Sequence, residues 1–252
     1  MIRALALMLL LAAPALAQET IVAGLSQNRV SITAGFTGEE IMIYGAVRRE
    51  TPPPGGPPLQ VIVTVEGPSS PLLVRKKERR AGIWVNAESV EIDSAPSFYA
   101  VASTAPLPQA LSEIDNLRYR ITIPRAIRAV GIAGEAADAP AFVQALLRLR
   151  EAEGNYRLTE GTVSFAEATL FRTDVALPAN LVEGDYRVRL FITRGGRVVD
   201  WQEQVIPVRK AGLERAIYAM SREKPLAYGI LSVSLAVLAG WLASTLFRLL
   251  RS

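Results

Sequence analysis

One uncharged stretch near the C-terminus, Leu226–Phe247, constrains this chain more than any other part of its sequence. At about 1.5 Å of rise per residue, a helix of this length just crosses a hydrocarbon core of roughly 30 Å. We therefore predict a transmembrane helix at 226–247, started by Pro225 and followed by a tail at 248–252. The residues before it must be either a targeting segment or a domain held at a membrane.

The first seventeen residues have the pattern of a cleavable secretory signal. Arg3 provides the positive start, residues 4–13 are an apolar run, and Ala15–Ala17 is a small-x-small cleavage site. A second membrane anchor is the alternative, but this apolar run is too short to span comfortably. We predict a signal peptide at 1–17.

Cleavage of this signal fixes the expected topology. The domain at 18–210 lies in the periplasm, the tail at 248–252 is cytoplasmic, and the protein is a single-pass protein of a bacterial inner membrane. Arg248 and Arg251 agree with the positive-inside rule, whereas Arg222 and Lys224, just before the helix, count against it.

The net charge of +4 and the pI near 9.6 come from the membrane-associated segments. Residues 18–210 contain 22 Lys and Arg and 22 Asp and Glu, so the predicted domain is neutral. The surplus lies in the signal, in residues 211–225 and in the tail, where it fits topology and attraction to anionic lipid. No field for binding nucleic acid is expected.

The chain contains neither histidine nor cysteine. This composition excludes Ser-His and Cys-His nucleophiles, an imidazole base and the usual nitrogen and sulfur zinc sites. We expect no catalytic, cofactor-binding or metal-binding residues and predict that the protein is not an enzyme. A domain of about 190 residues buries a core without disulfides.

Most of the domain has the period-two hydrophobicity of β-strands separated by turn residues. The predicted strands fall near 29–33, 40–44, 59–65, 163–165, 169–177, 186–193 and 198–208. We predict a mainly β, immunoglobulin-like sandwich. Tyr186 follows Gly184 and Asp185 at the start of a strand, which matches a structural tyrosine corner, in which the phenol bonds back to the backbone.

Phe98 and Tyr99 are adjacent aromatics on another predicted strand, 95–101. Successive side chains of a strand point to opposite faces, so we expect one of the two in the core and the other exposed.

The hydrophobic period changes in the middle of the domain, where we predict a small helical insertion at about 107–153. A first helix is predicted from the spacing of Leu111, Ile114 and Leu117. A second begins near Pro140 with Asp138 as its cap. Between the two helices, Arg118–Ile123 alternates like a strand.

Two segments are candidates for contacts with other molecules. The first is a basic run that reads as a hairpin tip and would contact lipid headgroups or an anionic partner, or would be a solvated loop: Arg75, Lys76, Lys77, Arg79 and Arg80. The second is a stripe of small residues on the transmembrane helix, suited to packing against another helix: Ser232, Ala236 and Gly240. We predict that residues 211–225 form an amphipathic juxtamembrane segment along the membrane surface, with a flexible stalk as the alternative.

Several ordered stretches together resemble the alphaproteobacterial transmembrane protein family Alph_Pro_TM. They are Leu25–Gln27, Phe36–Gly38, Tyr44–Gly45, Ala81–Asn86, Pro96–Tyr99, Leu170–Arg172, Leu177–Asn180, Pro225–Gly229 and Gly240–Ala243. The resemblance implies a single-pass exported protein without assigned activity or catalytic residues. It also implies genes that lie commonly beside permeases of the sulfite or organosulfonate exporter type.

The function expected from these observations is non-catalytic. We predict a membrane-anchored periplasmic accessory or scaffolding protein, for a permease of the sulfite or organosulfonate exporter type as the resemblance implies. Its partners would be the lipid bilayer and an integral membrane protein or a second copy, with no cofactor. The alternative is a periplasmic module that binds a small ligand or an envelope polymer.

Overall fold

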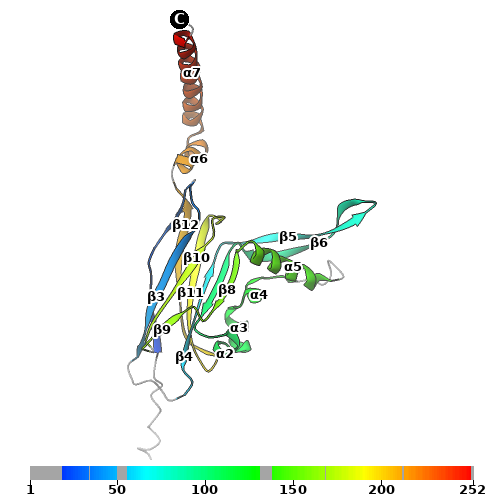
Figure 1. Ribbon diagram of the computed structural model, residues 1–252, viewed down its shortest axis with the longest axis vertical. Coiled ribbons are helices and arrows are strands. Elements are labelled where there is room, and N and C mark those ends of the chain that lie inside the picture. The colour runs from blue at the N-terminus through cyan, green and yellow to red at the C-terminus, as the bar shows by residue number, and fades with distance from the viewer. Residues whose placement is uncertain are drawn as a thin grey trace, which may run out of the picture.

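The structure is a computed structural model that describes residues 19–33, 35–49, 56–130, 138–167, 169–211 and 213–250, the side chains of 213–216, 219 and 245–250 excepted. The chain is mainly β, as predicted, and ends in one long helix, α7 (Pro225–Leu250) (Figure 1). The predicted signal peptide at 1–17 lies outside the described residues.

The first sheet is antiparallel and has four strands in the order β1-β3-β10-β9. Alternate residues of β10 are buried, which is the pattern of a sheet with one face on a core. The strand bounds are β1 (Glu19–Leu25), β3 (Glu39–Arg49), β9 (Ser164–Ala166) and β10 (Leu170–Leu177).

The second sheet has six strands in the order β2-β12-β11-β4-β7-β8. Its two outermost pairs, β2 with β12 and β7 with β8, are parallel, and the other pairs are antiparallel. The bounds are β2 (Val30–Ile32), β4 (Leu59–Glu66), β7 (Tyr99–Ser103), β8 (Tyr156–Glu160), β11 (Gly184–Arg194) and β12 (Arg197–Lys210).

The two sheets pack face to face around a first core. Ile43 of the first sheet and Val63 and Leu190 of the second are among its fully buried members. Beside this core, the backbone N–H of Ile21 on β1 donates to the carboxylate of Asp200 on β12 at 2.9 Å, which joins the two sheets along one edge.

The second sheet also has a core on its outer face, because a helical layer covers it. Ile62 and Phe191 of the sheet pack there with Leu111 and Leu146 of the helical segment. The helices are α2 (Leu107–Ala110), α3 (Glu113–Tyr119), α4 (Ile123–Ala126) and α5 (Ala139–Ala152). Strand β4 is therefore buried on both faces, which explains its almost continuous apolar sequence.

The helical segment is the crossover between two parallel neighbours, β7 and β8. Parallel strands cannot be joined by a tight turn, and their connection must return over one face of the sheet. Strand β8 does not appear among the predicted strands. The helices that we predicted as an insertion are the connection that this parallel pairing requires.

Two details of the middle segment were predicted wrongly. Arg118–Ile123 is not a strand: α3 continues to Tyr119, Arg120 caps it in the left-handed region, and α4 begins at Ile123. Leu111 is buried, but Ile114 and Leu117 are 78% and 51% exposed, so these three residues do not form one buried face.

The start of the second predicted helix is correct, but the capping contact is absent. Asp138 precedes α5, and Pro140 lies in its first turn. The Asp138 side chain makes no capping hydrogen bond.

Phe98 and Tyr99 point to opposite faces, yet both are fully buried. Phe98 belongs to the core between the sheets, whereas Tyr99 belongs to the core beneath the helical layer. The expectation that one of them would be exposed was wrong because the sheet has no solvated face at this strand.

Gly45, in the middle of β3, makes a testable packing prediction. A Cβ there would lie 2.5 Å from the ring of Phe171 on β10 and 2.6 Å from the carbonyl oxygen of Val22 on β1. We expect Gly45→Ala to lower the free energy of unfolding by about 1–3 kcal/mol, as overpacking does. Urea unfolding of the full chain in non-ionic detergent, followed by circular dichroism, measures this loss.

The matched control for this prediction is Gly240→Ala in α7, where an added Cβ meets nothing within 4 Å. We expect it to leave the urea midpoint unchanged. A Gly45→Ala variant as stable as the parent would show that Phe171 and the backbone of β1 move aside without cost.

The C-terminal helices lead away from the sheets. The predicted juxtamembrane segment contains α6 (Leu213–Glu223), and α7 follows directly. Within α7, residues 225–244 have a mean hydropathy of 1.9 and none is buried against the rest of the chain. The predicted transmembrane helix is therefore present as a helix of spanning length and composition.

Candidate functional site

A long hairpin leaves the second sheet between β4 and β7 and is the first candidate site. Its strands, β5 (Ser69–Arg80) and β6 (Ile83–Pro96), pair antiparallel along their length, and we call residues 69–96 the arm. Ala81 and Gly82 form the tip with φ of +50° and +86°, as two-residue hairpin turns require. Figure 1 shows the arm extending sideways, whereas α7 continues along the long axis of the molecule.

Only the base of the arm is packed. Val90 and Ile92 are buried there, and Leu72 and Val74 pack against the core beneath the helices. The far end, residues 75–89, contains no buried side chain. At the tip, the side chains of Ile83 and Trp84 are 64% and 69% exposed. Large apolar groups exposed together mark an interaction surface.

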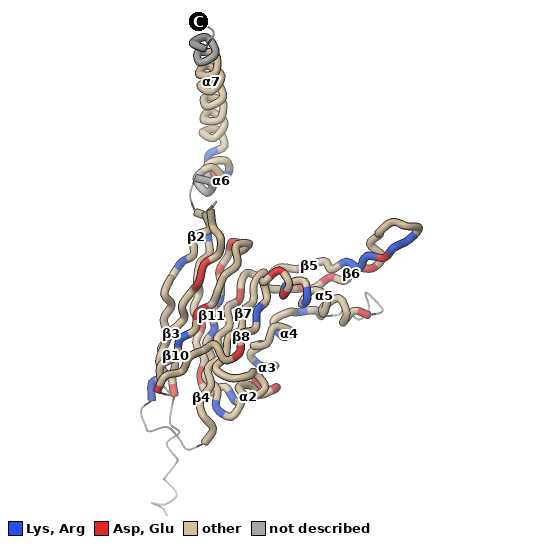
Figure 2. The backbone as a smooth tube through the Cα atoms, viewed as in Figure 1, with Lys and Arg blue, Asp and Glu red and all other residues tan. Residues whose placement is uncertain are grey.

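The five predicted cations all lie on β5 in this far end, as the blue segments of Figure 2 show. Lys76 pairs with Glu78 and Glu88 at 3.9 Å each, and Arg80 pairs with Glu78 at 3.2 Å. Within the described part of the chain, three of the five make no ion pair: Arg75, Lys77 and Arg79.

Strand register places two of these free cations beside the tryptophan. Arg79 lies opposite Trp84, and Lys77 lies opposite Asn86 two residues further along. Opposed residues and residues two apart share a face of a hairpin. We call Lys77, Arg79 and Trp84 the distal arm face; it combines positive charge with an exposed indole.

The second candidate site is a polar cavity of about 330 Å³ where the arm leaves the sheet, which we call the arginine pocket. Five arginines and two glutamates contribute to its wall, an excess of three positive charges. The lining residues are Glu66, Ser69, Ser94, Arg118, Tyr119, Arg120, Ala126, Arg128, Arg187, Arg189 and Glu203.

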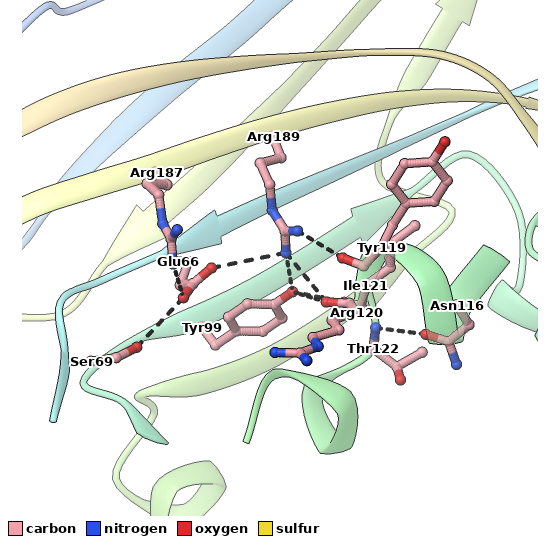
Figure 3. Close-up of polar contacts among 10 residues, drawn as sticks. All are labelled: Glu66, Ser69, Tyr99, Asn116, Tyr119, Arg120, Ile121, Thr122, Arg187 and Arg189. Atoms are coloured by element: carbon pink, nitrogen blue, oxygen red, sulfur yellow. Dashed lines mark hydrogen bonds and ion pairs between the residues drawn. The ribbon is translucent and has the colours of Figure 1, made fainter. Parts of the chain in front are cut away.

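Alternation along β11 places Arg187 and Arg189 on the outer face of the second sheet. Arg187 lies opposite Glu66 of β4, and Glu66 lies opposite Tyr99 of β7. The Arg187 Nη2 donates to Glu66 Oε1 at 2.6 Å, and Ser69 donates to the same oxygen at 3.5 Å (Figure 3). Arg187 therefore already compensates the charge of Glu66.

Arg189 fastens the helical layer to the sheet. Its guanidinium donates to the carbonyl oxygens of Tyr119 at 2.7 Å and Arg120 at 3.3 Å, and to the hydroxyl of Tyr99 at 3.0 Å (Figure 3). The hydroxyl of Tyr99 in turn lies within hydrogen-bonding distance of the carbonyl oxygen of Ile121, at 2.9 Å. Burial of the phenol raises the pKa of Tyr99 to about 12, against a lowering contribution from Arg189.

The other three arginines of the pocket have unpaired guanidinium groups. Among the described residues, no side-chain hydrogen bond or ion pair involves Arg118, Arg120 or Arg128, although Arg118 lies 5.3 Å from the ring of Tyr119. Arg120 and Arg128 are held by their backbones instead: Arg120 caps α3, and Arg128 exchanges two backbone hydrogen bonds with Ser94. Their side chains are exposed.

The composition of this pocket favours an anion. Within the described ranges, no three carboxylates lie close enough together to share a metal ion. The site was not predicted from the sequence, because a neutral total charge conceals a local cluster assembled from β11 and the α3–α4 region. The sequence did contain one signal for this cluster. Arg187 and Arg189 lie two residues apart on a predicted strand and therefore share one of its faces.

Tyr186 is the residue for which a tyrosine corner was predicted. The side chain is buried, and its hydroxyl donates to the carbonyl oxygen of Val182 four residues earlier at 3.0 Å. This is the backbone contact expected of a tyrosine corner. Burial also raises the pKa of this phenol.

The small-residue stripe lies on α7, whose side chains from 225 to 244 face outward. The Ser232 hydroxyl donates to the carbonyl oxygen of Tyr228 at 2.9 Å, so it is satisfied within its own helix. Ala236 and Gly240 are exposed as well. The association of Ser232, Ala236 and Gly240 with another helix stays a prediction.

The fold and α7 together define a class: a mainly β domain joined to one C-terminal helix of membrane-spanning length. The family model described as "Putative transmembrane protein (Alph_Pro_TM)" matches residues 20–249, and the chain belongs to this family. The resemblance noted from the sequence is thereby confirmed. No curated protein matches the chain.

Among solved structures, the chain is similar to the sporulation control protein Spo0M of Bacillus subtilis, with 12% sequence identity and a TM-score of 0.28. The match covers 81% of this chain and 55% of Spo0M. A TM-score this low carries no inference about fold or function.

Proposed function

We propose that the protein is a non-catalytic accessory subunit whose arm contacts an integral membrane protein beside it. In this proposal α7 anchors the chain in a bacterial inner membrane, residues 248–252 are cytoplasmic and the β domain is periplasmic. The facing sheets and the Tyr186 contact support an immunoglobulin-like sandwich as the carrier of the arm. A permease of the sulfite or organosulfonate exporter type is the partner that the family resemblance suggests.

The distal arm face is the observation that carries this proposal. The far end of the arm contains no buried side chain, and Trp84 is 69% exposed at its tip. Tryptophan and arginine are the residues most enriched where binding energy concentrates in protein interfaces. Lys77 and Arg79 are free to pair with acidic groups, so the partner surface is expected to be acidic.

Site-specific cross-linking tests the proposal, because the chain has no cysteine and an introduced one is unique. We expect Trp84→Cys, labelled with a cysteine-reactive photo-crosslinker in native membranes, to form an adduct with one integral membrane protein. Adding Lys77→Glu and Arg79→Glu to the same chain should reduce that adduct about tenfold, because both side chains would then repel the acidic partner surface instead of attracting it.

The matched control is Val199→Cys, at a half-exposed position on β12 away from the arm, which should give no such adduct. An adduct only with lipid at the arm would contradict the proposal, as would equal labelling of the same protein from both positions.

A specific observation also favours the second function, capture of a small ligand. The arginine pocket has unpaired cationic groups and a volume at the lower end of the range of about 300–1,000 Å³ found for ligand sites.

A further inference from the structure

We propose that the arginine pocket binds a small tetrahedral oxyanion, such as sulfate, phosphate or the sulfonate group of an organic solute. This site gives the small-ligand function a location and a ligand class. It does not depend on the docking role of the arm.

The arginine pocket carries an excess of positive charge. The pocket collects five guanidinium groups against two carboxylates in about 330 Å³. Arginine stays protonated at every physiological pH, so this excess cannot be relieved by titration. An anion relieves it, and guanidinium is the group that binds oxyanions through paired N–H donors.

Some of the guanidinium groups of the pocket are free to bind a ligand. Arg189 is committed to the backbone of Tyr119 and Arg120, and Arg187 to Glu66. The guanidinium groups of Arg120 and Arg128 are not committed, although their backbones are fixed by the cap of α3 and by the bridge to Ser94. Unpaired guanidinium groups on a fixed backbone suit a ligand site. The backbone is already ordered, so binding costs little additional conformational entropy.

The positions of the arginine donors favour one ligand geometry over another. Arg118 and Arg120 approach from α3 and its C-terminal cap, whereas Arg128 approaches from the segment after α4. A carboxylate has two oxygens in one plane, whereas a sulfate, phosphate or sulfonate offers three or four oxygens in different directions. Donors from separate elements therefore suit the tetrahedral group better.

The test measures thermal unfolding of the full chain in non-ionic detergent, at low ionic strength, with millimolar sodium sulfate, phosphate or methanesulfonate. Sodium chloride at equal ionic strength is the reference, because it corrects for screening. We expect saturable stabilisation by at least one of the three oxyanions. The double variant Arg120→Gln and Arg128→Gln should weaken the fitted affinity about tenfold or more, through the loss of two charge-assisted contacts.

The control is Arg197→Gln, which removes one exposed charge at the far hairpin of β11 and β12 and should bind like the parent. It separates a site from a general charge effect and from the non-specific stabilisation that sulfate gives folded proteins. Both backbone roles survive in the double variant, so its melting temperature without added anion should match that of the parent.

A second arm of the experiment identifies the source of the anion. The same chain is reconstituted in nanodiscs of phosphatidylcholine or phosphatidylglycerol. Stabilisation by phosphatidylglycerol alone, abolished by the double variant, would assign the site to a lipid phosphate, whereas stabilisation by the salts assigns it to a solute. No stabilisation by any of these probes, or equal stabilisation of parent and double variant, would overturn the proposal and leave the cross-linking result untouched.

Discussion

Replacing Phe191 by alanine is expected to lower the free energy of unfolding of the β domain by about 3–5 kcal/mol, the usual cost of removing a buried aromatic ring. The side chain has no exposed surface, although it lies on the outer face of the second sheet. Its ring lies 5.7 Å from that of Tyr119 and 6.3 Å from that of Trp201. A domain of this size should melt roughly 6–20 °C lower.

Circular dichroism of the full chain in non-ionic detergent provides the measurement. The matched control is Val205→Ala, on β12, where the side chain is half exposed and the change should stay within about 0.5 kcal/mol. Equal small effects from both substitutions would mean that the helical layer does not cover this face. The second core would then not exist as described.

Raising the pH above 10 is the second change with a large expected effect. The phenols of Tyr99, Tyr156 and Tyr186 are buried, and burial raises the pKa of each. In the unfolded chain these phenols have a pKa of about 10. Below that pH they are protonated in both the folded and the unfolded state, so the three tyrosines contribute their full stability. Above it the unfolded chain loses protons first, and stability falls until the folded pKa is reached, which is about 12 for Tyr99.

Each such tyrosine contributes a slope of about 1.4 kcal/mol per pH unit within its window, so three together cause a steep alkaline loss. Urea unfolding at a series of pH values from 9 to about 11.5 measures it. Tyr99→Phe should reduce the slope by about one proton. It should also lower stability at neutral pH by about 1–3 kcal/mol, because Arg189 loses an acceptor.

The control for this titration is Phe191→Leu, which loosens the same core without removing an ionisable group. It should shift the whole curve of stability against pH downward and leave its slope unchanged. An unchanged slope for Tyr99→Phe would contradict the assignment of a raised pKa to that phenol.

The arm and the arginine pocket adjoin each other. Ser69 begins β5, Ser94 lies near the end of β6, and both line the pocket. The backbone bridge between Ser94 and Arg128 ties this base of the arm to the segment that follows α4. The distal arm face and two lining residues of the arginine pocket thus belong to the same hairpin, although each proposal is tested by its own experiment.

Much of the β structure was predictable from local patterns. Alternation identified strands that correspond to β2, β3, β4, β10, β11 and β12, and Gly195 and Gly196 form the turn of a hairpin with φ of +57° and +79°. The basic run was predicted as a hairpin tip, and the structure has it on β5, directly before the turn at Ala81 and Gly82. These features depend on neighbours in sequence, since strand faces and two-residue turns are defined within a few residues.

The second core was not predictable in the same way. The β7–β8 pair is parallel, so its partners are separated by a crossover, and no local signal states which strands pair. Ile114 and Leu117 are apolar and three residues apart, as on one face of a helix, but both face solvent. The buried residue of α3 is Asn116. The arginine pocket has the same origin: Arg120 and Arg187 become neighbours only through that crossover.

The sequence by itself determined the apolar helix near the C-terminus, the mainly β class and the family. The helix and the class follow from composition and short-range periodicity, and the family follows from the ordered stretches that resemble it. Only the tertiary structure decided that the second sheet is buried on both faces, that the arm projects with Trp84 exposed, and that five arginines share one pocket. Those outcomes depend on which distant segments pair, and pairing is set by the packing of the whole domain.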